Sequence, residues 1–211
     1  MRIQTRGEEI ANSITHGIAA LLSIAGLVIL LVVSTEAGNV WAVTSLSVFG
    51  TVLIILYVVS TLYHGISHAG AKRVLKILDH SSIYLLIAGS YTPIAMVSLR
   101  GPWGWTLFGV IWGMALLGVC LQAVAIERFK ILSILSYLIM GWLVVIALKP
   151  LCQACPKELI RWLLIGGLFY TFGTIFYSWK KLPYHHTLWH LFVIGGSTAH
   201  FFGMLFYVAP I

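Results

Sequence analysis

The chain has 211 residues, of which 60% are hydrophobic and only 9% are charged, well below the roughly 25% charged residues of ordinary soluble domains. This composition excludes a soluble globular protein and indicates an integral membrane protein, with one domain covering residues 1–211. The formal net charge of +7 comes mainly from basic residues between the apolar runs, so it does not indicate nucleic-acid binding.

Seven apolar runs follow one another along the chain. Most of them reach the roughly 17–25 residues that a helix needs to cross a bilayer. The first run resembles a signal peptide, but it is longer than the usual hydrophobic region of about 7–15 residues and lacks a convincing cleavage site. We therefore expect an all-α polytopic protein with seven transmembrane helices. The expected spans are 14–34, 41–64, 80–98, 104–125, 131–149, 159–178 and 187–208.

Basic residues are distributed unevenly over the segments between these spans. If the N-terminus is cytoplasmic, the cytoplasmic segments hold Arg2, Arg6, Lys72, Arg73, Lys76, Arg128, Lys130, Lys180 and Lys181. The outer segments then hold only Arg100, Lys149, Lys157 and Arg161. Cytoplasmic segments of membrane proteins are enriched in Lys and Arg. The sequence therefore predicts a cytoplasmic N-terminus and a C-terminus outside.

The first span is preceded by the polar segment GEEIANSITHGI. It places His16 close to Glu8, Glu9 and Asn12. We interpret His16 as part of a polar helix cap or a lid, and not as a metal ligand.

The second span ends in STLYHGISH, on the predicted cytoplasmic side. His64 falls at the end of the helix, and Ser60 lies one turn deeper on the same face. His68 would be a rival to His64 if the helix continued. Because Gly65 and Gly70 give this stretch a loop-like sequence, we expect His68 to be solvated at the membrane interface.

The third span begins with LDHSSIYLLIAGSYTP. Asp79, the sole aspartate of the chain, is expected to open this helix on the same side of the membrane as His64. His80 would point about 100° away from Asp79 around the helix axis. Pro93 lies inside the span, where a membrane helix tolerates proline as a kink.

Small residues recur at helical spacing in two spans. Gly109 and Gly113 lie in the fourth span, and Gly195, Ala199 and Gly203 lie in the last. Such stripes let membrane helices approach closely. We expect them to pack within the bundle, in preference to forming a dimer interface.

The chain has three cysteines. Cys120 lies within the fourth span, and Cys152 and Cys155 form a C-x-x-C in a predicted outer loop. Without a second such pair or histidines on that face, a zinc site there is disfavoured. A loop disulfide and two unpaired surface thiols both stay open.

The last span begins with HHTLWH. His186 and His190 share a helix face, with Cβ atoms about 5–6 Å apart, so both rings can reach one ion. Histidines at this spacing also occur by chance and can bind backbone or headgroup atoms. His185 points away from His186, and His200 lies about 15 Å further along the axis, where a hydrogen-bonded core histidine is expected.

Three separate segments thus place ionisable groups at one level of the predicted cytoplasmic side. Such groups are expensive at membrane depth and mark functional sites. His64, His186 and His190 are the candidate metal ligands, because three imidazoles and one open position are typical of catalytic zinc. Asp79 and Ser60 are the candidate catalytic residues, which would orient or deprotonate water or bind the substrate oxygen.

Five segments of the chain resemble the bacterial hemolysin III branch of the progestin and adipoQ receptor family. They are EEIANSITHG, STLYHGISH, LDHSSIYLLIAGSYTP, FKILSILSYLIMGW and LPYHHTLWHLFVIGGSTAHFFG. The resemblance implies a seven-helix plasma-membrane protein with a cytoplasmic N-terminus and Zn²⁺ near the cytoplasmic face. It implies metal ligation by His64, His186 and His190, and it matches the serine and aspartate of the family to Ser60 and Asp79.

This resemblance is compatible with three functions. The wider superfamily includes alkaline ceramidases, so the first is a zinc-dependent hydrolase of amide or ester bonds in membrane lipids. The alternative is a non-enzymatic regulator or sensor of membrane homeostasis with structural zinc. The third, which the family name suggests, is a haemolytic or pore-forming protein, although the spans lack a recurring polar stripe that could line a channel. The oligomeric state stays open.

Overall fold

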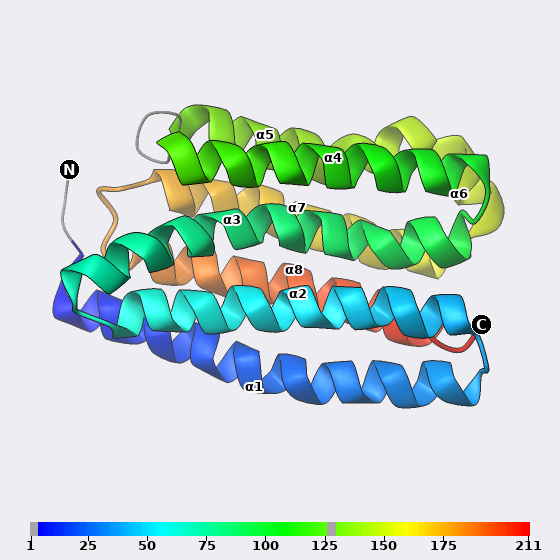
Figure 1. Cartoon of the computed structure of the whole chain (residues 1–211), viewed down its shortest axis with the longest axis horizontal. Coiled ribbons are helices and arrows are strands. Elements are labelled where there is room, and N and C mark those ends of the chain that lie inside the picture. The colour runs from blue at the N-terminus through cyan, green and yellow to red at the C-terminus, as the bar shows by residue number, and fades with distance from the viewer. Residues whose placement is uncertain (1–3, 126–129) are drawn as a thin grey trace.

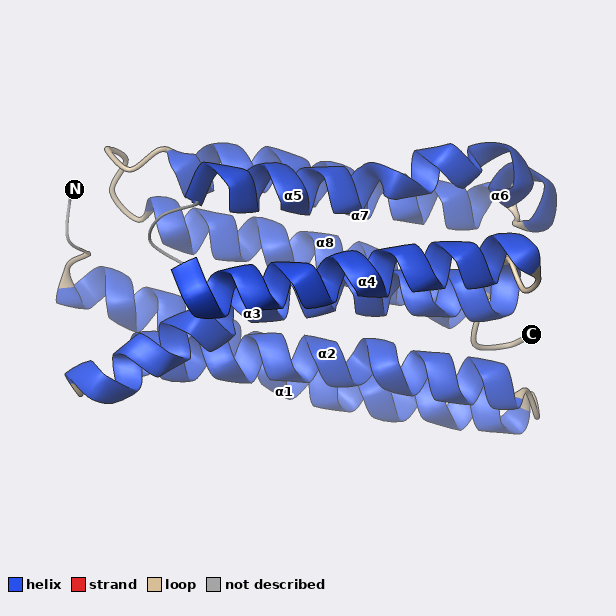
Figure 2. Cartoon of the chain, turned by 45° about the horizontal axis from the view of Figure 1, so that its top comes forward, coloured by secondary structure: helices blue, strands red, loops and turns tan. Residues whose placement is uncertain are grey.

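The chain is built from helices. The computed structural model describes residues 4–125 and 130–211, and within these residues it contains no strand (Figure 2). The elements are α1 (Arg6–Glu36), α2 (Val40–Gly65), α3 (Ala69–Pro93), η1 (Ile94–Ser98), α4 (Pro102–Ala125), α5 (Lys130–Trp142), η2 (Leu143–Ala147), α6 (Leu148–Ala154), α7 (Lys157–Ser178) and α8 (His185–Tyr207). Arg2 and Arg128, which the orientation argument uses, lie outside the described residues.

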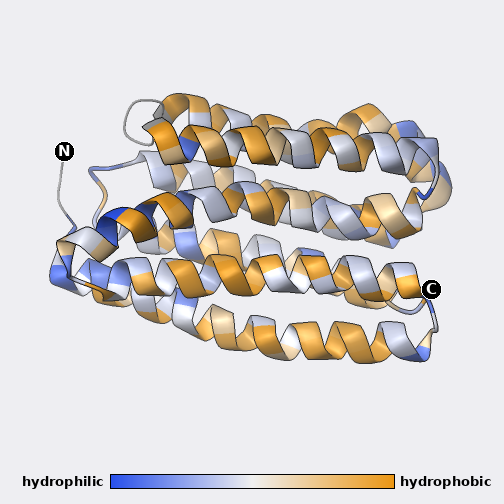
Figure 3. Cartoon of the chain, in the orientation of Figure 1, coloured by the Kyte–Doolittle hydropathy of each residue, from blue (hydrophilic) through white to orange (hydrophobic). Residues whose placement is uncertain are grey.

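Seven helical stretches of the described chain are long and apolar enough to cross a membrane, which confirms the predicted number of spans. They run side by side along the long axis of the molecule, and hydrophilic residues gather towards its ends (Figures 1 and 3). The chain therefore has the form of a multi-pass membrane bundle. Its orientation across the membrane stays a prediction.

Helices that are distant in sequence meet at the end of the bundle that carries the N-terminus. α1, α3 and α8 begin there, and α2 ends there (Figure 1). α1 packs against both α2 and α8, and α2 packs against α3. Segments far apart in sequence therefore meet at this end, where the predicted site residues also lie.

The third span begins earlier than predicted. α3 starts at Ala69, and His68 is its N-cap, accepting a hydrogen bond at Nδ1 from the Ala71 N–H at 3.3 Å. The first turns hold Ala, Lys, Arg and Leu, which are good helix formers. Asp79 therefore lies well inside a helix, and the prediction that it opens the helix is wrong.

Pro93 does not end the third span. The helix continues as the π-helical turn η1, in which the Leu99 N–H donates to the Ile94 carbonyl at 2.8 Å. Proline lacks an N–H and crowds the carbonyl four residues earlier. A local π-helical adjustment allows the span to continue past it, as the sequence predicts for a membrane helix.

The fifth span is longer than predicted. α5, η2 and α6 follow one another without a break, so the span reaches Ala154. Cys152 therefore lies in a helix and not in a loop. Both Cys152 and Cys155 are free thiols, and Cys155 is buried, so the expectation of two surface thiols holds only for Cys152.

The two glycine stripes behave differently. On α8, a Cβ at Gly195 would lie 2.7 Å from the Phe169 ring, and one at Gly203 would lie 3.0 Å from Trp162, so this stripe packs tightly against α7. On α4, a Cβ at Gly109 or Gly113 would meet nothing within 4 Å. The prediction of packing within the bundle is therefore confirmed for α8 and wrong for α4. The glycines of α8 lie on a face that contacts another helix, whereas those of α4 do not.

Candidate metal centre

The last turn of α2 places His64 inside the bundle, as predicted. The side chain is buried, and its Nδ1 lies 2.7 Å from Oε2 of Glu9 on α1. Its other ring nitrogen, Nε2, is buried and has no hydrogen-bond partner. A buried, unpartnered nitrogen is costly unless something else binds it, and a metal ion is the partner best suited to an imidazole lone pair.

The other two histidines come from the first turns of α8. Tyr184 precedes this helix in the left-handed conformation, with φ of 55°, and its N–H donates to Oε1 of Glu8 at 2.8 Å. This contact fastens the start of α8 to α1. His186 and His190 then lie one turn apart on the buried face of α8.

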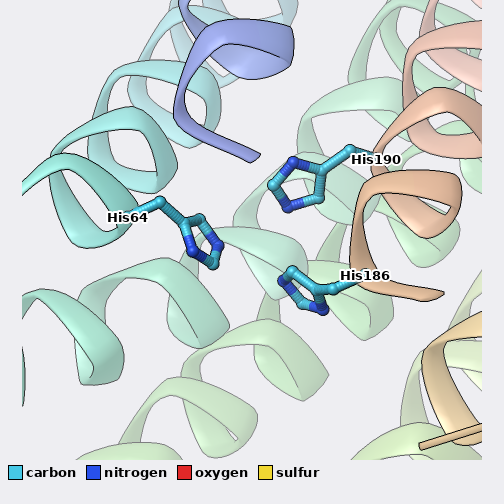
Figure 4. Close-up of side chains that lie close together, drawn as sticks. All are labelled: His64, His186 and His190. Atoms are coloured by element: carbon cyan, nitrogen blue, oxygen red, sulfur yellow. The ribbon is translucent and has the colours of Figure 1, made fainter. Parts of the chain in front are cut away.

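The three imidazoles converge (Figure 4). The ring centroids of His64 lie 5.1 Å from His186 and 5.2 Å from His190, and those of His186 and His190 lie 4.7 Å apart. One nitrogen from each ring lies within 4.8 Å of the others. Among the described residues, these three form the group that can hold a metal ion, as the sequence predicts.

The chemistry of this donor set fits a transition metal. Neutral imidazoles suit Zn²⁺, whereas Mg²⁺ and Ca²⁺ prefer oxygen ligands. Three protein ligands leave one tetrahedral position of Zn²⁺ for water or substrate. The unpartnered Nε2 of His64 and the three converging rings therefore fit Zn²⁺. Binding of this ion stays a proposal.

Ser60 and Asp79 lie beside the histidines, as the sequence predicts, although Asp79 is inside α3 and not at its start. Both are buried and line a cavity of about 20 Å³ together with His16, His186 and His190. This volume is sufficient for one water molecule. Asp79 stands outside the group of mutually close ligand atoms, which agrees with a role towards water and not towards the metal.

A second, larger cavity adjoins the small one. It has a volume of about 370 Å³ and extends between α3, α5, α7 and α8, lined mostly by apolar side chains. The two cavities share the lining residues Leu56, Ile83, Trp189 and Val193. A polar space for water thus lies next to an apolar space of ligand-binding size, for which about 300–1,000 Å³ is typical.

The remaining histidines take different places. His185 turns away from the cluster, with Nδ1 3.1 Å from the Phe176 carbonyl, and His200 lies in the bundle with Nε2 3.3 Å from the Leu163 carbonyl. His68 is exposed at the N-cap of α3. These placements confirm the predictions for His185 and His200 and the expected exposure of His68. His80 lines the small cavity without belonging to the metal-holding group.

His16 is the main surprise among the histidines. Thr5 is the N-cap of α1, so His16 is not a helix cap, but it lies outside the metal-holding group, as the sequence predicts. The imidazole is buried and stacks on His190, with ring centroids 3.4 Å apart and planes at 11°. Its nitrogens have no hydrogen-bond partner. His16 therefore covers a metal-ligand candidate and faces the water-sized cavity.

Sequence reasoning missed the role of α1 at the site. Glu9 contacts His64, and Thr15 Oγ1 lies 3.3 Å from Nδ1 of His190. A signal was present, because Glu8, Asn12 and Thr15 recur at one-turn spacing at the start of a largely apolar helix, and Glu9 adjoins them. Such a polar stripe indicates contact with other polar groups inside the bundle.

The fold and the site define a multi-pass membrane protein, in bacteria a protein of the plasma membrane, with a buried three-histidine cluster at one end of a seven-helix bundle. The sequence model for the family described as "Haemolysin-III related" matches residues 4–201. The chain belongs to this family.

Relatives of known name match over nearly the whole chain. Hemolysin-3 of Bacillus cereus is 49% identical over 203 residues, which cover 96% of this chain and 93% of the relative. The Hemolysin-3 homolog of Bacillus subtilis (strain 168) is 48% identical, with 97% and 96% covered. The Monocyte to macrophage differentiation factor of Homo sapiens is a more distant relative, 27% identical over 95% of this chain and 84% of its own length.

Proposed function

We propose that the protein binds Zn²⁺ through His64, His186 and His190 and hydrolyses an amide or ester bond of a membrane lipid. One observation carries this proposal. The histidine cluster borders a cavity for a single water, and that cavity adjoins an apolar cavity of about 370 Å³. Hydrolysis of a lipid needs water and an acyl chain at one place, and this arrangement supplies both spaces.

The metal would supply Lewis-acid catalysis to this reaction. Zn²⁺ is a Lewis acid that polarises a carbonyl and makes water a stronger acid. His64, His186 and His190 would hold it as neutral ligands. The aromatic and aliphatic residues around them, including Trp189, would exclude bulk water and strengthen electrostatic interactions at the site.

The chain's own polar residues would handle the protons. Asp79 lines the water-sized cavity and can accept a proton from water there, then return it to the leaving group. Ser60 lines the same cavity and can donate a hydrogen bond to the substrate oxygen. Their buried positions keep both side chains at fixed places relative to the three histidines.

The larger cavity would hold the acyl chain. Its lining is dominated by Leu, Ile, Val and aromatic side chains, which favour an apolar chain over water. A few polar groups, including Thr171 and Thr174, interrupt this lining. The substrate class is therefore a lipid with an acyl chain, drawn from the surrounding membrane.

The second candidate function is non-enzymatic, with zinc in a purely structural role. The observation in its favour is that the three histidines join α2 to α8, while α1 contacts both helices through polar groups. In that case the protein would be a regulator or sensor of membrane homeostasis. Removal of zinc would unfold the bundle, and no lipid product would form.

Membrane lysis, which the name of the Bacillus relatives suggests, is the third candidate function.

The deciding experiment combines lipid and metal analysis. Cells expressing wild-type protein are compared by untargeted lipidomics with cells expressing the His64, His186 and His190 alanine variants, and metal content is measured on the same purified proteins. We expect a free fatty acid and its partner product to accumulate only with wild type, together with about one zinc per chain.

Two outcomes would decide against this proposal. Purified, zinc-loaded protein that is inactive on a broad panel of lipid amides and esters points to the structural role. Leakage of liposomes caused by the purified protein, without turnover, supports membrane lysis.

Filling the apolar cavity should impair turnover without removing the metal. Gly167 lines this cavity, and a Cβ there would have only the Trp142 ring nearby, at 3.8 Å. Gly167→Phe is expected to raise KM for long-chain substrates at least tenfold, more than for short-chain ones, because a phenyl ring would occupy acyl-chain space. Zinc content should equal that of wild type.

The control is Gly113→Phe on α4, because a Cβ there meets nothing within 4 Å and Gly113 does not line the cavity. Equal effects of the two substitutions on short-chain and long-chain substrates would contradict the assignment of this cavity.

A further inference from the structure

Two adjacent glutamates at the start of α1 have different partners. The Glu8 carboxylate accepts hydrogen bonds from two backbone N–H groups, that of Thr5 at 2.8 Å and that of Tyr184 at 2.8 Å. The Glu9 carboxylate contacts two side chains: Oε2 lies 2.7 Å from Nδ1 of His64, and Oε1 lies 2.9 Å from Nζ of Lys72. Glu9 therefore connects α1 with the candidate metal ligand His64.

The contact with Glu9 determines which nitrogen of His64 carries the proton. The ion pair with Lys72 keeps the carboxylate in its acceptor form. An acceptor 2.7 Å from Nδ1 requires a hydrogen on Nδ1. A neutral imidazole then has its lone pair on Nε2, which is the buried nitrogen without a hydrogen-bond partner.

The second ligand contacted by α1 has a matching arrangement. The Thr15 hydroxyl donates to the carbonyls of Ala11 and Asn12, at 2.9 and 3.0 Å. Its single proton is used there, so Oγ1 accepts from Nδ1 of His190 at 3.3 Å. The polar face of α1 thus favours a protonated Nδ1 on both His64 and His190, and a free lone pair on Nε2 of each.

We propose that Glu9 is a positioning residue for the metal centre. Its carboxylate holds His64 in the tautomer protonated at Nδ1 and directs Nε2 towards the ion, while Lys72 holds the carboxylate in place. This inference rests on zinc binding at the three histidines. Carboxylates that orient a zinc-bound histidine in this way typically raise metal affinity by 10–100-fold.

A merely structural role makes a different prediction. Glu9 joins α1, α2 and the start of α3, so its removal could loosen the bundle without a specific effect on the metal. Glu8 is the matched control, because it is the same residue type in the same turn and also joins α1 to α8 through the Tyr184 N–H. The two roles separate when metal affinity and folding are measured together.

The experiment compares full-length wild type with Glu9→Gln and Glu8→Gln in detergent. Zinc affinity is measured by competition with a chromophoric chelator, and the folded fraction is measured by size exclusion and thermal unfolding. Glu9→Gln keeps the size of the side chain but allows an amide N–H to face Nδ1, so both tautomers become accessible. We expect zinc affinity 10–100-fold below wild type, with folding close to wild type.

Glu8→Gln should show the opposite pattern, with a lower unfolding temperature and wild-type zinc affinity. Lys72→Met keeps Glu9 and removes its tether, so we expect a smaller loss of zinc affinity than in Glu9→Gln. If Glu9→Gln does not fold, Lys72→Met and Glu9→Asp provide the same comparison of affinity with stability.

The outcomes distinguish this inference from the proposed function. Wild type that binds no zinc would overturn both. Wild type that binds zinc, with Glu9→Gln equally tight, would overturn only the positioning role. Equal losses of affinity in Glu8→Gln and Glu9→Gln would assign Glu9 to bundle stability and likewise overturn it.

Discussion

Replacing His186 with alanine is expected to remove zinc from the protein and to abolish lipid hydrolysis. The imidazole of His186 lies 5.1 Å from that of His64 and 4.7 Å from that of His190, centroid to centroid. Its loss leaves two ligands, too few for a buried zinc site, which normally has three or four protein ligands. Metal content by mass spectrometry should fall from about one zinc per chain to background.

His185→Ala is the control for this experiment. His185 is adjacent in sequence and also buried, but its Nδ1 contacts the Phe176 carbonyl, away from the cluster. We expect wild-type zinc content and measurable turnover in His185→Ala, with some loss of stability. Zinc retained in His186→Ala, or lost equally in both variants, would contradict the assignment of the ligands.

Replacing Asp79 with asparagine is expected to lower kcat by about 10²–10⁴-fold, the range for loss of a general acid–base group. Zinc content should stay at the wild-type value, because Asp79 lines the water-sized cavity but stands outside the group of close ligand atoms. Asparagine keeps the size of the side chain and cannot accept a proton from water. Turnover of a lipid substrate and metal content on the same preparation test both statements.

Glu158→Gln is the charge-matched control, since Glu158 is an exposed carboxylate in the first turn of α7. It should leave kcat unchanged. Ser60→Ala should give a smaller loss of kcat than Asp79→Asn, because it removes a hydrogen bond and leaves the proton acceptor. Loss of zinc in Asp79→Asn would instead make Asp79 a ligand and overturn its assignment to water.

The position of Glu9 changes how the first helix is understood. α1 contributes no residue to the metal-holding group, yet its first turns contact His64, His190 and the start of α8. The family resemblance includes this segment, EEIANSITHG. The structure supplies a physical reason for a polar stripe at the start of an otherwise apolar helix.

Much of the architecture follows from the sequence alone. A helix needs about 20 apolar residues to cross a bilayer, and because lipid offers no hydrogen-bond partners, the backbone groups must pair within the helix. The seven spans are therefore visible in the hydrophobic pattern. The pair His186 and His190 is also visible, because helix geometry sets their spacing locally. The hydrophobic pattern does not determine the helix boundaries: α3 begins at Ala69 and α6 reaches Ala154, because helices extend beyond the apolar stretch.

What the tertiary structure alone decided concerns contacts between helices. Glu9 reaches His64 because α1 packs against α2. The inward face of each helix also decided that the glycines of α8 pack tightly while those of α4 do not. Sequence periodicity describes the faces of a single helix, but their pairing depends on side-chain packing across the whole bundle. For that reason the ligand candidates could be predicted from sequence, whereas the carboxylate behind His64 and the cavity beside it could not.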